Sequence, residues 1–236
     1  MNDELSRIRQ AEAHSHTEAY NNLVPFEAGS WLSKPVKTVM ELMPYFRDYP
    51  NFRGLDLGCG VGRNCIPVLK ALPETGGIMD CVDILPLAID RLRENAVKYG
   101  VSSGINGIVC AADEYPVAQS SYDLILGISV LEHLSSPEIL AGKLRQIRDG
   151  LRAGGIACFV INTGIEEHSK TTGAPLPVQF EINMDTREME QLLTDTFSGF
   201  EILKHSVIHY TYDTYRESGI TELDTDVLTL AVRKRN

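Results

Sequence analysis

The segment LDLGCGVGRN, Leu55 to Asn64, holds three glycines in ten residues, directly behind an alternating apolar stretch. A strand that ends in a glycine-rich turn and leads into a helix presents backbone N–H groups to a ligand that approaches the main chain closely. Asp56 lies inside the strand, where its carboxylate would repel a pyrophosphate and attract a ligand ammonium. We therefore predict that a ligand with a positive charge binds at this turn.

From Phe52 onward, short apolar runs alternate with segments of helical periodicity, a pattern typical of βαβ units in a parallel sheet. The predicted strands are Arg53–Leu57, Ile78–Asp83, Ile105–Cys110, Tyr122–Ile128 and Ile156–Asn162. The predicted helices between them are Asn64–Leu72, Pro86–Tyr99 and Pro137–Leu151. Asn64 is expected to cap the first of these helices. The fold class is therefore α/β.

The rhythm changes after the fifth strand. Ile161–Met184 is polar and far longer than the usual connection of about 4–6 residues, so it is a candidate lid. Asp185 is a plausible N-cap for a helix, and Phe200–Tyr212 and Val227–Arg233 are predicted strands. Residues 1–51 are expected to form a helical N-terminal appendage or lid, and residues 52–236 the main domain.

Two further carboxylates follow predicted strands. Asp83 ends the second strand, where it can accept hydrogen bonds from both hydroxyls of a ribose. Asp113 follows the third strand, where it can accept from an exocyclic amine such as adenine N6. The dinucleotide fingerprint G-x-G-x-x-G is not matched, because its third glycine position falls on Arg63. A nucleotide-dependent oxidoreductase is therefore disfavoured.

Taken together, Asp56, the glycine turn, Asp83, Asp113 and the strand YDLILGISVLEHL resemble the class I S-adenosylmethionine-dependent methyltransferases over about Phe52 to Val160. The segments GCGVGRN, TREMEQLL before FSGFEILK, and VLTLAVRKR are most similar to the tellurite-resistance-type branch. The resemblance implies a Rossmann-like, doubly wound seven-stranded sheet, mostly parallel with an antiparallel last strand. It also implies S-adenosyl-L-methionine as the cofactor and residues 52–236 as the methyltransferase domain.

The cofactor-binding residues implied by the resemblance come from the strand ends and the glycine turn. Gly58 and Gly60 would line the methionine part of the cofactor, while Ile84 and Ile128 would pack against the adenine and the sulfonium side. No metal site is predicted. The full set is Asp56, Gly58, Cys59, Gly60, Arg63, Asn64, Asp83, Ile84, Ala112, Asp113 and Ile128.

The acceptor side is harder to read from sequence. His133 lies where the fourth strand delivers the chain to the active-site edge, so it is the candidate catalytic residue, with a structural hydrogen bond as the alternative. Tyr20 and Trp31 fit either an amphipathic flap or a wall of the acceptor pocket. Glu166, Glu167 and His168 are expected to lie on a solvated surface.

The predicted function is in-line methyl transfer to a small-molecule acceptor, with a catalytically silent cofactor-binding module as the alternative. A net charge of −10 disfavours nucleic acid as a partner. No apolar run approaches the roughly 18 residues that a membrane span needs. The five cysteines are scattered singly and are expected to be reduced thiols in a cytoplasmic protein. The oligomeric state stays open, with a homodimer as one option.

Overall fold

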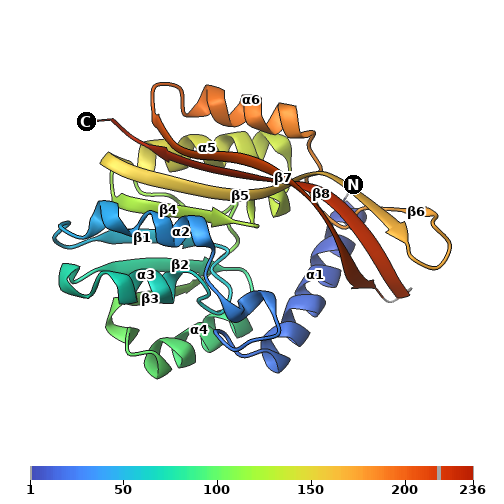
Figure 1. Ribbon diagram of the computed structural model, residues 1–236, viewed down its shortest axis with the longest axis horizontal. Coiled ribbons are helices and arrows are strands. Elements are labelled where there is room, and N and C mark those ends of the chain that lie inside the picture. The colour runs from blue at the N-terminus through green and yellow to red at the C-terminus, as the bar shows by residue number, and fades with distance from the viewer. Residues whose placement is uncertain (1, 217–218, 236) are drawn as a thin grey trace.

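The structure, a computed structural model, describes residues 2–216 and 219–235. Within them an eight-stranded sheet has helices on both faces (Figure 1). The strands are β1 (Arg53–Leu57), β2 (Ile78–Asp83), β3 (Ile105–Val109), β4 (Tyr122–Ile128), β5 (Leu151–Ser169), β6 (Pro175–Leu176), β7 (Glu201–Arg216) and β8 (Gly219–Arg233). The α-helices are α1 (Asn2–Asn22), α2 (Lys37–Glu41), α3 (Cys65–Ala71), α4 (Pro86–Lys98), α5 (Pro137–Gly150) and α6 (Thr186–Thr196).

Five short 3₁₀ helices complete the described elements: η1 (Trp31–Ser33), η2 (Met43–Phe46), η3 (Pro73–Thr75), η4 (Ser102–Gly104) and η5 (Leu131–His133). The last of these directly follows β4 and therefore lies at the carboxyl edge of the sheet. None of the helices in the described residues is long and apolar enough to cross a membrane.

The strand order is β3-β2-β1-β4-β5-β8-β7, with β6 paired to β5. β1 to β5 pair in parallel, β8 is antiparallel to β5, and β7 is antiparallel to β8. The predicted α/β, Rossmann-like fold with an antiparallel last strand is confirmed. The sheet has eight strands instead of the predicted seven, because the two-residue β6 adds to β5 through Glu167 and Leu176.

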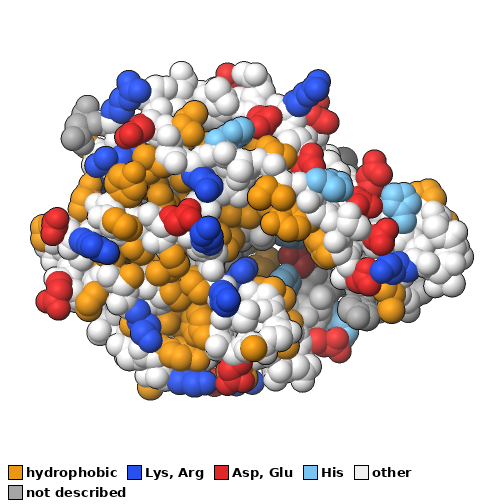
Figure 2. Space-filling view, in the orientation of Figure 1, with side chains coloured by type: hydrophobic (Ala, Val, Ile, Leu, Met, Phe, Trp, Pro, Cys, Tyr) orange, Lys and Arg blue, Asp and Glu red, His pale blue; other side chains and the backbone are white. Residues whose placement is uncertain are grey.

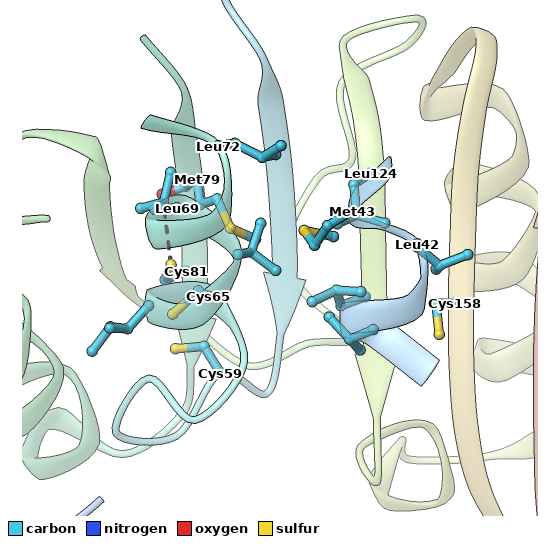
Figure 3. Close-up of a cluster of buried hydrophobic side chains, with 14 of the residues drawn as sticks. Leu42, Met43, Cys59, Cys65, Leu69, Leu72, Met79, Cys81, Leu124 and Cys158 are labelled. Atoms are coloured by element: carbon cyan, nitrogen blue, oxygen red, sulfur yellow. Dashed lines mark hydrogen bonds between the residues drawn. The ribbon is translucent and has the colours of Figure 1, made fainter. Parts of the chain in front are cut away.

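The core has one part on each face of the sheet. On one face α2, η2, α3 and α4 cover β2 and β4, and on the other face α5 and α6 cover β1, β4, β5 and β8. Figure 3 shows the first part, where sulfur-containing side chains meet leucines. Four of the five cysteines are buried, and Cys110 is half-buried. Because α2 and η2 share this core, the domain boundary between residues 51 and 52 stays a prediction.

The segment Ile161–Met184 is not the polar loop that its composition predicts. β5 continues to Ser169 and stays paired with β8, and from Phe159 to Glu167 every second residue along it is buried. The polar residues among them are satisfied by hydrogen bonds, since Thr163 Oγ1 donates to the Asp226 carbonyl over 3.0 Å. The inward residues are Ile161, Thr163, Ile165 and Glu167. A strand pattern was therefore concealed by buried polar side chains, and the lid prediction is wrong for residues 161–169.

Two local predictions are also corrected. Glu167 is not solvated, because Arg216 Nε and Thr221 Oγ1 donate to its Oε1 over 2.7 and 2.6 Å and the side chain is 1% exposed. Asn64 occupies the N-cap position of α3, but its side chain makes no cap hydrogen bond. Its Oδ1 instead accepts from Val36 N over 3.0 Å, which ties the N-terminal segment to the glycine turn.

Candidate functional site

A cavity with about 850 Å³ of empty space, part of it open to solvent, lies at the carboxyl ends of β1, β2, β3 and β4. Figure 2 shows the surface hollowed at this place, between the N-terminal segment and the projecting ends of β7 and β8. Open α/β sheets bind ligands at this edge. The predicted site residues that line the cavity are Gly58, Asp83, Ile84, Ala112, Asp113 and His133.

The glycine turn has left-handed backbone at Gly58 (φ 67°) and Gly60 (φ 52°). A Cβ at Gly58 would lie 2.6 Å from Val130 Cγ2, and one at Gly60 would lie 2.9 Å from Tyr20 Oη. Side chains are therefore excluded by both the backbone conformation and neighbouring protein atoms. The turn packs closely against the chain that follows β4 and against α1.

Asp83 is fixed at the end of β2. Its Oδ2 accepts from Gly60 N and its Oδ1 accepts from Leu85 N, each over 2.9 Å. Burial raises the pKa of this carboxyl above its usual range. Each carboxylate oxygen can accept more than one hydrogen bond, so Asp83 keeps acceptor capacity toward the cavity that it lines.

Asp56 is 1% exposed and lies below the glycine turn. Neither of its oxygens has a hydrogen-bond partner among the described residues. Burial and the nearby charge of Asp83 raise the pKa of Asp56 to about 7, and Cys65 offsets only part of this effect. A buried carboxylate without a partner is the feature that a ligand cation at this turn would stabilise.

Because the pKa of Asp56 is raised, the folded protein binds a proton that the unfolded chain releases, so stability falls as pH rises from about 4 to 7. Asp56→Asn should remove this component, which amounts to at most about 1.4 kcal/mol per pH unit. Urea unfolding at pH 5 and pH 7 measures the difference. Asp48→Asn, at an exposed position, is the control. If the Asp56 variant and the wild type lose stability in parallel, Asp56 is ionised in the folded protein throughout this range.

The other predicted cofactor residues do not line the cavity. Cys59 and Ile128 are core side chains. Arg63 Nε donates to the Lys34 carbonyl over 2.8 Å, and its guanidinium lies 5.6 Å from the centre of the Trp31 ring. Like Asn64, Arg63 therefore contacts the segment between α1 and α2. Their assignment to the cofactor stays a prediction.

Helix α1 covers the cavity with one stripe of side chains, spaced so that they lie on the same helix face. The stripe consists of Arg9, Glu12, Ala13, His16 and Tyr20. Sequence reasoning singled out only Tyr20, because the stripe is mostly polar and gives no apolar periodicity. The spacing of residues 9, 12, 13, 16 and 20 along one helix face was the available signal.

The stripe follows the predicted cofactor groove from end to end. At one end Tyr20 approaches Gly60, and at the other Arg9 Nη2 donates to Asp113 Oδ2 over 3.1 Å and to Ser135 Oγ over 2.9 Å. Burial acts to raise the pKa of Asp113, but Ser135, which donates to Oδ2, and Arg9 hold it below its usual range. α1 is thus linked directly to the residue that the resemblance places at the adenine.

His133 lies in a group of charges that the sequence did not reveal. Its Nδ1 is 2.9 Å from Glu181 Oε2 and 3.1 Å from Glu12 Oε2, and its ring stacks on Phe180. Burial acts to lower the pKa of His133, but the hydrogen bonds to Glu12 and Glu181 raise it to about 10. The His133 nitrogen and the carboxylate oxygens of Glu12 and Glu181 lie within 4.8 Å of one another, a spacing at which all three could also bind one metal ion. Because Arg9 Nε lies 3.4 Å from Glu181 Oε1, we interpret the group as an ion-pair network.

Comparison with known proteins adds to this geometry. A family model described as a methyltransferase domain matches residues 55–155. The tRNA N(3)-cytidine methyltransferase METTL2 of Danio rerio is 29% identical over 124 residues, which are 50% of this chain and 35% of that protein. The ubiquinone biosynthesis O-methyltransferase of Parvibaculum lavamentivorans is 24% identical over 200 residues, which are 80% of this chain and 75% of that protein. The chain thus spans about a third of the length of the first of these relatives.

Solved structures share the fold. TehB from Haemophilus influenzae has a TM-score of 0.63 at 20% identity, with 85% of this chain and 62% of that chain covered. The 1,6-didemethyltoxoflavin-N1-methyltransferase of Burkholderia thailandensis, solved with 1,6-didemethyltoxoflavin and S-adenosylhomocysteine, has a TM-score of 0.59 at 16% identity, with 98% and 90% covered. Together with the matched methyltransferase domain, this shared fold confirms the predicted resemblance to the methyltransferase superfamily. The resemblance to the tellurite-resistance-type branch stays a prediction.

Proposed function

We propose that this chain, which carries a methyltransferase domain of the class I S-adenosylmethionine-dependent superfamily, transfers a methyl group to a small-molecule acceptor. The observation that carries the proposal is Asp83, which two backbone N–H groups fix at the edge of the cavity, beside the glycine turn. A fixed carboxylate at the end of the second strand is suited to accept from ribose hydroxyls.

The residues present fit S-adenosylmethionine at three points. Asp83 offers free acceptor capacity for the ribose, and Asp113 follows β3 where an exocyclic amine of adenine would lie. Asp56 does not line the cavity, but it is a buried carboxylate without a partner just below the turn, so its charge would favour a ligand ammonium on the other side of the turn. When bound, the cofactor supplies an activated methyl group for an in-line displacement.

The chain's own residues then align the acceptor with the methyl donor and exclude water from the cavity. α1 lies over the cavity, so an acceptor held beneath it would be shielded from solvent and positioned close to the methyl donor. We infer that α1 forms part of the lid that the sequence predicts within residues 1–51, and that His133 is the polar side chain nearest to the acceptor. A catalytic base is optional in this reaction.

Two observations favour a small acceptor over tRNA, on which some of the relatives are named to act. The net charge of −10 repels a phosphate backbone. The cavity is covered by α1 and lined by the carboxylates of Glu12, Asp83, Asp113 and Glu181, which disfavour a polyanion further. Among the relatives, an O-methyltransferase of ubiquinone biosynthesis and ajmaline N-methyltransferase are named for small molecules.

Calorimetry with S-adenosylmethionine, S-adenosylhomocysteine and NAD tests the cofactor assignment. We expect binding of the first two ligands in the micromolar range and none of NAD, because Asp56 and Arg63 replace features that a dinucleotide site needs. Binding of NAD alone would favour the oxidoreductase alternative. Turnover against a panel of amine, phenol and thiol acceptors then separates an enzyme from a silent cofactor-binding module.

A further inference from the structure

The ion-pair network around His133 joins three separate parts of the chain. His133 belongs to η5 after β4, Glu181 precedes α6, and Glu12 and Arg9 come from α1. The Glu181 side chain is 1% exposed and the His133 side chain 18%. Glu181 lies 48 residues from His133 along the chain, so no local sequence pattern links the two residues.

Both carboxylates approach the same ring nitrogen. Glu181 Oε2 and Glu12 Oε2 lie 2.9 and 3.1 Å from Nδ1, while Phe180 covers one face of the ring with its centroid 5.0 Å away. Since His133 lines the cavity, Nε2 is the polar atom that the ring can still offer to a molecule bound there. A histidine whose Nδ1–H is held by a carboxylate has its tautomer and orientation fixed in this way.

The two carboxylates differ in how firmly they are held. The chain that carries Glu181 is anchored next to η5, because Ile182 N donates to the Glu132 carbonyl over 2.9 Å. Glu12 reaches His133 only through the position of α1. The other charged or titratable groups near the ring are Glu132 on η5, Arg9 beside Glu181, and His16, whose Nε2 lies 3.6 Å from Glu12 Oε1.

We propose that Glu181 is the positioning residue of His133, that Glu12 joins it when α1 docks, and that the two carboxylates together hold the imidazole so that Nε2–H donates a hydrogen bond to the methyl acceptor. This inference rests on the proposed function. The acceptor enters while α1 is open and only Glu181 holds Nδ1. As α1 closes, the second carboxylate stabilises the protonated imidazole further, so that Nε2–H is available as a donor. An acceptor oxygen held by Nε2–H would keep a second lone pair free to attack the methyl group that a bound cofactor would supply, and its own proton would leave to solvent.

The inference is tested by NMR titration of the His133 imidazole in the full chain, without ligand and with S-adenosylhomocysteine, with the resonances assigned from His133→Gln. We expect the wild-type midpoint near 10, and shifts to lower pH of about 1 to 3 units in Glu181→Gln and in Glu12→Gln. Glu181→Asp should restore part of the shift. Glu166→Gln, at an exposed position on β5, is the matched control and should leave the midpoint unchanged.

The tautomer gives a second readout that a merely structural glutamate would not control. Above the midpoint, ¹⁵N shifts should show the wild-type proton on Nδ1 and a free Nε2, and this preference should weaken in Glu181→Gln. A proton on Nε2 in the wild type, or a midpoint that neither variant moves, overturns the inference. Displacement of the His133 signals by added Zn²⁺ at stoichiometric amounts also overturns it, in favour of a cation site. Failure of the wild type to bind S-adenosylhomocysteine in calorimetry would instead refute the proposed function, because the titration of the unliganded protein stands without it.

Discussion

Asp83→Ala should weaken binding of S-adenosylmethionine by about 1.5–3 kcal/mol, roughly 10- to 150-fold in Kd, as measured by calorimetry. The variant removes a charged acceptor from the ribose hydroxyls. It also releases the N–H groups of Gly60 and Leu85, which the carboxylate holds at 2.9 Å. The loss should therefore lie near the upper end of this range. Asp83→Asn, which keeps an acceptor oxygen, should lose less.

Asp80→Ala is the matched control for this experiment. Asp80 lies on the same strand and is 5% exposed, but it accepts from Arg53, Asn106 and Tyr122, away from the cavity. Its loss should lower the free energy of unfolding by about 1–3 kcal/mol and leave cofactor affinity unchanged. If Asp83→Ala binds S-adenosylmethionine as tightly as the wild type, the ribose assignment is wrong. If both variants lose affinity equally, general destabilisation is the cause.

Sequence reasoning succeeded where one physical signal dominated. β1, β2 and β4 have the predicted bounds, because strands of a parallel sheet are buried on both faces and appear as continuous apolar runs. The positions of Asp83 and Asp113 at the cavity follow from the same logic, since the residue after a parallel strand must lie at the carboxyl edge.

The incorrect predictions share a cause: buried polar groups form hydrogen bonds with residues that are far away in the sequence. β5 continues past Asn162 although its buried Thr163 and Glu167 look like loop residues, because β7 and β8 supply their hydrogen bonds. Glu181 reaches His133 from 48 residues away, and no local pattern marks that distance. The residues at the strand ends of the site could therefore be predicted from sequence, whereas the individual contacts that its N-terminal cover makes could not.

The last prediction concerns α1, the helix that covers the cavity. The helix is polar and buries few side chains of its own, so it should open at low free-energy cost and close when ligand fills the groove. Hydrogen exchange of the α1 amides should therefore slow when S-adenosylhomocysteine binds. In Arg9→Ala/Glu12→Ala the contacts to Asp113, Glu181 and His133 are lost. Exchange in α1 should then be faster, and ligand dissociation should accelerate by roughly 10-fold or more.

The matched control uses the same residue types on the opposite side of the helix. Arg7 and Glu18 are exposed and do not line the cavity, so Arg7→Ala/Glu18→Ala changes charge and helix propensity in the same way without touching the site. It should leave both exchange and dissociation as in the wild type. If the two double variants behave alike, α1 acts through its net charge or its helicity, and the acceptor must be enclosed by the strand ends and η5 alone. If only the cavity-facing variant changes, the stripe of α1 is the moving wall of the site.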